Sequence, residues 1–372
     1  MRESRRCPGA ALSRTSPGPR RNTPAQGAQE FAASGLDELD RGIVQALQIH
    51  PRAPWTLVGE VLGINSVTAA RRWQRLRDAG LAWVTAYPRL TDPRLVVSGV
   101  VEVDTEPGAA QHVADALARQ PAVVNIKITA GGRDLVLSVQ ARGLDQLEDL
   151  TARLFRGTAG VRATRTHVFT GVPTEGSRWR LRSLDDEQCA RLEAAAPRLA
   201  VTGGAADDGD ALDARLVELL SIDGRMSVRE LAATAGAAQT TVRRRLQALV
   251  PDRVSLRCDV ARPLSGWPLS AVYFASVPSR HLDVVSRTLV GVREVRSCAI
   301  TAGPHNLVVD VWLRALTDVH AFETHLTRQL PRLTIDDRSV VLRTVKHMGH
   351  LLDRGGCCVG IVPVVAAPEP VP

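Results

Sequence analysis

The sequence predicts an α+β protein in which two mainly helical domains, each followed by a strand, alternate with two domains of mixed helix and strand. The first observation is a repeat: the string ITAG, two variable residues, Asp or Asn, and LV occurs at 128–136 and again at 300–308. The second is that LDRGIVQAL from Leu39 matches LDARLVELL from Leu212, at almost the same separation along the chain. The third is the spacing of apolar residues, because each copy begins with helical periodicity and continues with short apolar runs typical of strands. The chain is therefore one two-domain unit written twice.

A length of 372 residues accommodates four small domains. The N-terminal arm is rich in Pro, Gly, Ser and Arg, which favours disorder; it could touch an anionic partner or be an inert tail. The expected division is a disordered basic arm at 1–35, a helical domain with its following strand at 36–90, a mixed domain at 95–172, a linker with a short helix at 173–210, a second helical domain at 211–263, a second mixed domain at 268–349, and a disordered tail at 354–372.

The composition points to a soluble protein with an anionic partner. The net charge of +8 favours such a partner, although an excess of Arg is also what a GC-rich coding sequence gives, and Lys occurs only at Lys127 and Lys346. No apolar run reaches the roughly 18 to 20 residues of a membrane span, so we expect a cytoplasmic protein without a membrane partner. The six cysteines lack metal-ligand spacing, so we expect reduced thiols, no metal and no cofactor.

Each helical domain is expected to hold three helices. In the first copy, Ser34 is a candidate N-cap for helix one, Thr56 can cap helix two, and Gly63 ends it in a left-handed conformation. Asn65 then caps a third helix at 66–78. In the second copy, Ser227 and Glu230 form a capping box, Gly236 ends helix two, and the third helix covers 239–249.

A glycine turn before the last of three short helices is typical of a helix-turn-helix, whose last helix can enter the major groove of double-stranded DNA. Short polar side chains let the backbone approach base edges, and arginines reach phosphates or guanine. The alternative is a basic, solvated face. The expected DNA-binding residues are Asn65, Ser66, Thr68, Arg71, Arg72 and Arg75 in the first copy, and Gln239, Thr240, Thr241, Arg243, Arg244 and Arg245 in the second. The strands expected after these helices, at 81–90 and 254–263, would be the wings of two winged helix-turn-helix domains.

The back half of each copy has the order βαββαβ, which is the ferredoxin-like arrangement. Such a sheet has one bare face that needs a partner, and here the partner can be the other copy in the same chain. The repeated loop between its second and third strands could bind a carboxylate, or it could be a plain hairpin turn. Its candidate effector residues are Thr129, Gly131, Asp134, Thr301, Gly303 and Asn306.

These features resemble the Lrp/AsnC, or feast/famine, family of bacterial transcription regulators. The resemblance rests on LDELDRGIVQAL, LGINSVTAARRWQRLRDAGL and ITAGGRDLVLSV in the first copy, and on LDARLVELLSIDGRMSVRELA, VRRRLQAL, ITAGPHNLVVDV and VVLRTVKH in the second. It implies a DNA-binding regulator that pairs through its effector sheets and is modulated by a small molecule, with amino acids common in the family. Homo-oligomers beyond the paired units are compatible with it.

Two departures from the family pattern matter. The tandem chain resembles a dimer fused into one polypeptide, and Asn65, Ser66 and Val67 become Ala238, Gln239 and Thr240, so an imperfect inverted repeat is the expected DNA site. The loops hold Gly-Arg-Asp and Pro-His-Asn, which puts an amino-acid effector in question. The alternatives are an enzyme resembling the haem-precursor (siroheme-type) decarboxylases, with His167, His305 and His347 as scattered candidates, and a metabolite sensor that does not bind DNA.

Overall fold

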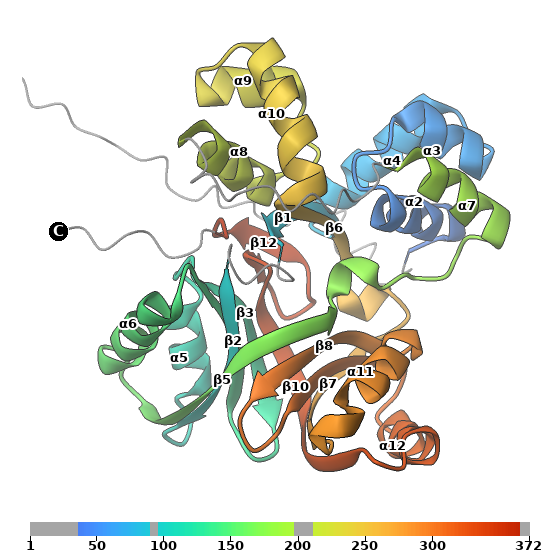
Figure 1. Cartoon of the computed structure of the whole chain (residues 1–372). Helices are drawn as coiled ribbons and strands as arrows, with labels where there is room; N and C mark the ends of the chain where they lie inside the picture. The colour runs from blue at the N-terminus through green and yellow to red at the C-terminus, as the bar shows by residue number, and fades with distance from the viewer. Residues whose placement is uncertain (1–35, 90–95, 197–210, 365–372) are drawn as a thin grey trace, which may run out of the picture.

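The computed structural model describes residues 36–89, 96–196 and 211–364 (Figure 1). Two groups of helices sit at one end of a large β-structure, and further helices pack on its outside. The expected arm at 1–35 and the N-cap Ser34 lie outside the described residues.

The first helical domain contains α2 (Glu38–Ile49), α3 (Trp55–Leu62) and α4 (Ser66–Asp78). Asp37 caps α2 by accepting the Asp40 N–H at 2.8 Å. The expectation that Thr56 caps α3 is wrong, because α3 begins one residue earlier, after Pro54, and has no side-chain cap. Gly63 ends α3 with φ of 65°, as expected for a left-handed C-cap.

The second helical domain repeats the scheme with α8 (Ala211–Ile222), α9 (Val228–Ala235) and α10 (Gln239–Asp252). The capping box between Ser227 and Glu230 is confirmed, and Gly236 ends α9 with φ of 66°. α10 continues beyond its expected end at Leu249.

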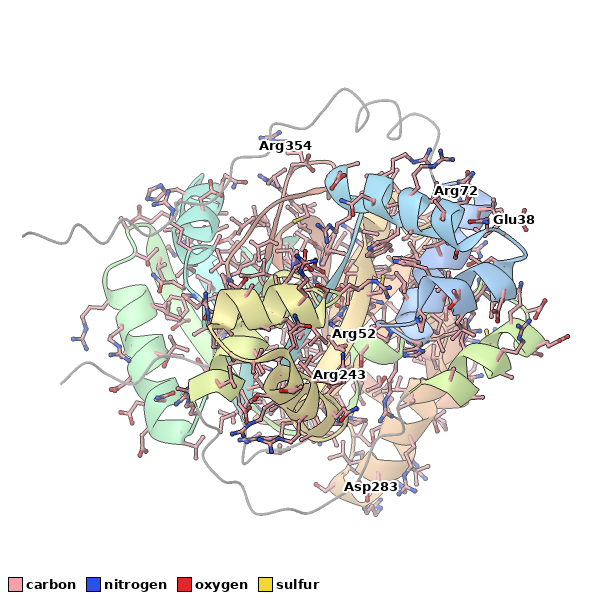
Figure 2. All side chains as sticks on the ribbon, turned by 90° about the horizontal axis from the view of Figure 1, so that it is seen from above. Glu38, Arg52, Arg72, Arg243, Asp283 and Arg354 are labelled. Atoms are coloured by element: carbon pink, nitrogen blue, oxygen red, sulfur yellow. The ribbon has the colours of Figure 1, made fainter. Side chains whose placement is uncertain are left out.

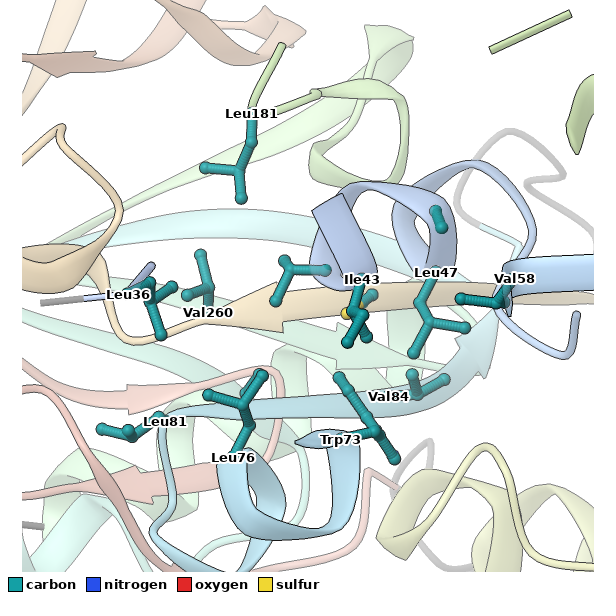
Figure 3. Packing of buried hydrophobic residues seen from close by; sticks show 14 of the residues in the cluster. Leu36, Ile43, Leu47, Val58, Trp73, Leu76, Leu81, Val84, Leu181 and Val260 are labelled. Carbon is teal, nitrogen blue, oxygen red and sulfur yellow. The ribbon is translucent and has the colours of Figure 1, made fainter. Parts of the chain in front are cut away.

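The strands after these helices, β1 (Ala82–Pro88) and β6 (Val254–Val260), correct the expectation of a wing in each domain. They pair with each other in an antiparallel ladder, with Val84 opposite Cys258. Each strand also packs into the other copy: Val260 lies in the core of the first helical domain (Figure 3), and Ala86 lies in that of the second. The two helical domains therefore share their hydrophobic cores through exchanged strands.

A reciprocal pair of arginines joins the two helical domains at equivalent turns. Arg52 donates to the carbonyls of Gly224 and Met226 at 2.5 and 2.9 Å. Arg225 returns the contact at 2.7 and 2.9 Å to the carbonyls of Pro51 and Ala53. Burial lowers the pKa of Arg225 to about 10, and the charge of Arg52 contributes to this lowering, so Arg225 remains cationic near neutral pH.

Both mixed domains have the expected βαββαβ order, which confirms the ferredoxin-like assignment. The first comprises β2 (Val97–Thr105), α5 (Ala110–Leu117), β3 (Val123–Ala130), β4 (Leu135–Ala141), α6 (Leu144–Arg156) and β5 (Val161–Thr174). The second comprises β7 (Leu269–Ser276), α11 (Leu282–Gly291), β8 (Val295–Ala302), β9 (Leu307–Leu313), α12 (Asp318–Gln329) and β10 (Thr334–His347), with short 3-10 turns η2 (Arg262–Leu264) and η3 (Ser279–His281) before β7 and α11.

The two sheets join at both edges, β5 to β8 and β10 to β3, and so close into an antiparallel barrel of eight strands. The four helices lie outside this barrel (Figure 1). The alternation of side chains along each strand sends one set to these helices and the other into the barrel. The middle of the interior is apolar and contains Val100, Val136, Val272, Phe274, Val308 and Val341.

The linker contains the expected short helix, whereas the tail, expected to be disordered, contributes a strand. β5 is followed by η1 (Gly176–Arg178) and α7 (Asp186–Ala195), which Asp185 caps together with Gln188. The Gln188 side chain donates to Val61 O at 2.9 Å, so α7 is docked on the first helical domain. In the expected disordered tail, β12 (Cys358–Ile361) pairs with β11 (His350–Leu352), and Cys358 N–H donates to Gly80 O.

Arg225→Met should destabilise the protein by about 1–3 kcal/mol, because two buried carbonyls lose their donor. Denaturant unfolding of the purified chain measures this. The matched control is Arg229→Met, an exposed arginine of α9, for which a change below about 0.5 kcal/mol is expected. Equal stabilities of the two variants would show that the reciprocal contact is energetically unimportant.

Candidate nucleic-acid interface and effector region

The N-terminal end of α4 is exposed and has a fixed backbone. Asn65 Oδ1 accepts the Val67 N–H at 2.8 Å, which confirms the cap and occupies the acceptor atom of that side chain. Val67 itself is 72% exposed, an unusual position for a large aliphatic side chain. In α10 the equivalent region starts at Ala238, without a side-chain cap, and Gln239 and Thr240 are exposed.

The predicted arginines divide into two groups. Arg72 forms ion pairs with Asp37 at 2.6 Å and Asp40 at 3.0 Å, and Arg75 reaches Asp40 at 3.1 Å. In the second copy, Arg245 pairs with Asp213 at 3.3 Å. Arg72 and Arg245 therefore connect the third helix of each domain to its first helix.

Sequence reasoning placed all these arginines on an outer face and missed their acidic partners. Asp40 is 1% exposed, so its charge requires a partner inside the domain. Hydrogen bonds with Asp37 and Asp40 raise the pKa of Arg72. The available signal was that Asp40 and Asp213 occupy equivalent positions of the two copies, just as Arg72 and Arg245 do.

The second group remains at the surface. Arg71, Arg243 and Arg244 are exposed, and no carboxylate of the described residues pairs with them. Ser66, Thr68 and Thr241 are partly or fully exposed near the helix starts. Figure 2 is seen from the end that carries the helical domains. It shows Arg72 on α4 and Arg243 on α10, with Arg52 between the two groups of helices.

In the repeated loops, the polar side chains of the predicted effector residues already have hydrogen-bond partners, either in the turn or in the neighbouring chain. Thr129 donates to Arg133 O at 2.8 Å, and Thr301 makes the equivalent bond to His305 O at 2.6 Å. Asp134 accepts from Thr105 N and Oγ1, and Asn306 bonds both backbone groups of Val277. Gly131 and Gly303 have φ of 131° and 156°, and a Cβ on Gly131 would lie 2.8 Å from Arg338 O.

A cluster of buried polar side chains lies beside the two loops, at the far end of the barrel, which is the end away from the helical domains. Arg133, 5% exposed in its side chain, forms ion pairs with Glu102 and Asp337 and lies 4.1 Å from the ring centroid of Phe274. His167 Nε2 is 2.6 Å from Glu102 Oε1. Burial alone would raise the pKa of Glu102, but the bond with His167 and the charge of Arg133 lower it below its usual value.

The histidines that seemed scattered in sequence fall into two places. The rings of His167 and His305 lie 6.4 Å apart at the far end of the barrel, and His305 Nδ1 is 2.9 Å from Asp336. His347 lies at the other end, 3.3 Å from Asp259.

A second buried cluster occupies the end of the barrel that faces the helical domains, and sequence reasoning missed it. Asp259, at the end of β6 and 1% exposed, pairs with Arg257 at 2.8 Å and with Arg296. Burial would raise the pKa of Asp259, but Arg257, His347 and Arg296 hold it well below its usual value. No repeated motif marked these residues, because Arg257 and Asp259 come from β6 and Arg296 from β8.

The described residues contain no group of His, Cys, Asp and Glu suited to a metal ion. None of their helices is long and apolar enough to cross a bilayer. The cysteines within this part of the chain are free thiols, and Cys7 lies outside it.

Comparison with known proteins connects this geometry to a family. The family model of the AsnC-type helix-turn-helix domain matches residues 36–77 and 210–250, and that of the Lrp/AsnC ligand binding domain matches 98–179. An HTH-type transcriptional regulator of Pyrococcus abyssi is 27% identical over 144 residues, 38% of this chain and 90% of its own length. AldR, an HTH-type transcriptional regulator of Mycolicibacterium smegmatis, is 27% identical over 147 residues, 38% of this chain and 85% of its own.

A solved structure resembles the whole tandem arrangement. The siroheme decarboxylase NirDL superposes with a TM-score of 0.55 over 84% of this chain and 93% of its own, at 13% identity. This likeness concerns the fold. The matches show that the chain contains two AsnC-type helix-turn-helix domains and an Lrp/AsnC ligand binding domain, which are the domain types of the Lrp/AsnC family of transcriptional regulators.

Proposed function

We propose that this regulator holds a two-part operator with α4 and α10 of a single chain and that a small molecule tunes its affinity for DNA. The supporting observation is that α4 and α10, the two recognition helices, lie at one end of the molecule. They carry exposed arginines at equivalent positions, Arg71 and Arg244. The exchanged strands and the pair Arg52 and Arg225 hold the two helical domains in one arrangement. A location in the cytoplasm, with the DNA, follows from this proposal.

In the proposed complex, α4 and α10 enter successive major grooves, whose half-sites lie roughly 34–36 Å apart. Arg71, Arg243 and Arg244 contact phosphates or the acceptor edge of guanine. Small polar residues at the helix starts, among them Ser66, Thr68, Gln239 and Thr241, allow close approach to the bases. Arg72 and Arg245 keep each recognition helix on its domain, and Arg75 is divided between Asp40 and the surface.

The two half-sites are expected to differ in sequence. Val67 and Thr240 occupy equivalent exposed positions, and an aliphatic side chain there favours the methyl group of thymine, whereas a hydroxyl can bond a base edge. Since one chain supplies both recognition helices, a single chain is sufficient for the operator, and larger homo-oligomers would serve additional operators.

The family's effector is proposed to be a small metabolite, with amino acids among the candidates. The loop residues Thr129, Gly131, Asp134, Thr301, Gly303 and Asn306 remain candidates for binding it. Their side-chain groups already hold the hairpins, so a ligand there would depend on backbone groups or on displacing these bonds.

A decarboxylase of haem precursors is the second candidate, favoured by the whole-chain likeness to NirDL and by the proximity of His167 and His305. The barrel cavity, about 110 Å³, is smaller than the roughly 300–1,000 Å³ of pockets for drug-sized ligands, and a tetrapyrrole is larger still. Titration with iron-uroporphyrin III tests this candidate: a visible absorbance shift at stoichiometric ratio would favour the enzyme over the regulator.

Arg71→Ala and Arg244→Ala should each weaken operator binding by about 1–3 kcal/mol, because each removes a cation from the contact surface, and should reduce the salt slope by about 1 if the lost contact is to phosphate. Genomic fragments selected by the purified protein supply the operator, and fluorescence anisotropy at several salt concentrations measures affinity. Arg156→Ala, on exposed α6, is the charge-matched control. If both variants bind DNA like the wild type, the assigned recognition helices are wrong.

Arg72→Ala is expected to behave differently from Arg71→Ala. It leaves Asp40 without one of its two partners inside the domain, so it should lower the free energy of unfolding by about 1–3 kcal/mol as well as DNA affinity. Arg71→Ala should leave the unfolding curve unchanged. Equal stabilities for the two variants would contradict the division of the arginines into two groups.

Val67→Thr should change the sequence preference of one half-site only, by about 1–3 kcal/mol at the affected base pair, because it replaces a methyl by a hydroxyl at nearly constant volume. Selection of DNA from a randomised operator library, followed by sequencing, measures the preference. The control is Val290→Thr on α11, which is 39% exposed. An unchanged motif would remove Val67 from the contact surface.

A further inference from the structure

A cavity of about 110 Å³ lies inside the barrel at the end that faces the helical domains. Each of the eight barrel strands contributes to its wall, from Ser98 on β2 to His347 on β10. The repeated loops and their cluster around Glu102 and Arg133 lie at the opposite end. The cavity is therefore separate from the predicted effector residues.

The wall of this cavity contains buried polar groups without partners among the described residues. Arg296 is 2% exposed; its Nη2 bonds Asp259, whereas its Nε and Nη1 bond nothing. The Oε1 of Gln140, 2% exposed, and the Oγ of Ser98, 7% exposed, also lack partners. Native proteins rarely leave such groups unsatisfied, so a bound molecule or water is expected to complete them.

Arg296 keeps N–H groups at Nε and Nη1, on two different edges of its guanidinium, for a ligand. Its planar faces are covered, because the guanidinium carbon lies 4.3 Å from the ring centroid of Trp312 and 4.9 Å from that of Trp179. Only the in-plane N–H groups at Nε and Nη1 remain. Because Nη2, which bonds Asp259, lies between them, each of these groups donates to a separate acceptor oxygen.

The cavity is lined by three cations, Lys127, Arg257 and Arg296, and by the carboxylates of Glu175 and Asp310, and Asp259 pairs with both arginines. Arg257 and Arg296 share one carboxylate, that of Asp259, and no other carboxylate of the described residues forms an ion pair with either arginine. Burial lowers the pKa of His347, which keeps it neutral near pH 7. Lys127 is compensated by Asp310 at 2.7 Å. Glu175 also lines the cavity; its Oε1 accepts from the hydroxyls of Ser177 and Ser255, and its Oε2 has no hydrogen-bond partner among the described residues.

We propose that this cavity binds a small 2-hydroxy or 2-oxo carboxylate. The carboxylate accepts from a free in-plane N–H group of Arg296. The second oxygen function meets Gln140 Oε1 as a donating hydroxyl, or accepts from Ser98 Oγ as a carbonyl. A volume of about 110 Å³ corresponds to about four water molecules in the liquid, which limits the ligand to roughly four to seven heavy atoms.

The position of the site suggests how the ligand acts. Arg257, on the cavity wall, belongs to β6, and β6 pairs with β1 to join the two helical domains. An anion bound to these arginines therefore contacts the strand pair that joins the two helical domains. Binding itself is independent of the proposed DNA-binding function, whereas its regulatory meaning rests on that function.

Isothermal titration calorimetry of the full chain without DNA tests the proposal. L-lactate and pyruvate are the probes, and lactamide, which differs from lactate by charge, is the matched neutral molecule. We expect saturable binding of at least one acid and at least tenfold weaker binding of lactamide. Absence of binding by both acids, which leaves the cavity to water, or equal binding of lactate and lactamide would overturn the proposal.

Two variants locate the site. Ser138→Leu, on the cavity wall, should abolish binding by filling the space, and Thr301→Val, in the second repeated loop, should leave it unchanged. If Ser138→Leu does not fold, Ser98→Val replaces it, and at least tenfold weaker binding is expected. Binding that survives the folded cavity variant, or that Thr301→Val removes, would place the ligand at the loops and reject this site.

Discussion

The arrangement of this molecule depends on one constraint: each half of the chain is completed by the other. β1 and β6 each pack in the cores of both helical domains, and Arg52 and Arg225 bond carbonyls across the boundary in both directions. Below them, the sheets close on each other at two edges. Because neither half can bury its strands alone, the relative position of the recognition helices is part of the folded structure and not the property of a flexible tether.

The barrel combines an apolar middle with two polar ends of different composition. Residues related by the repeat differ at the far end, where Glu102 corresponds to Phe274 and His167 to Ser339. There, Arg133 of the first copy pairs with Asp337 of the second. At the end near the helical domains, two arginines share one carboxylate beside a cavity. A fused chain permits this asymmetry, since its halves can diverge while a symmetric homodimer cannot.

The recognition helices show how the same residue type performs two tasks. Arg72 and Arg245 face buried or partly buried aspartates of their own domains, whereas Arg71, Arg243 and Arg244 face solvent. In the loops with the repeated TAG motif, the two threonines have the same task, because each bonds a backbone carbonyl within its hairpin turn. The repeated residues therefore include some that hold each copy together, such as Arg72 and Arg245, and others that face solvent, such as Arg71 and Arg244.

The sequence alone determined the local structure: the third helix at 66–78, the caps at Asn65 and Ser227, the left-handed glycines at Gly63 and Gly236, and the order βαββαβ. These features follow from hydrogen bonds and periodicity within a few residues, so they can be predicted from the sequence alone. Only the tertiary structure decided that β1 pairs with β6, that the tail adds β12, that Asp40 neutralises Arg72, and that Arg257, Asp259 and Arg296 surround a cavity. These contacts join strands and helices distant in the chain, and their partners are selected by burial and charge compensation in three dimensions, which no local pattern records.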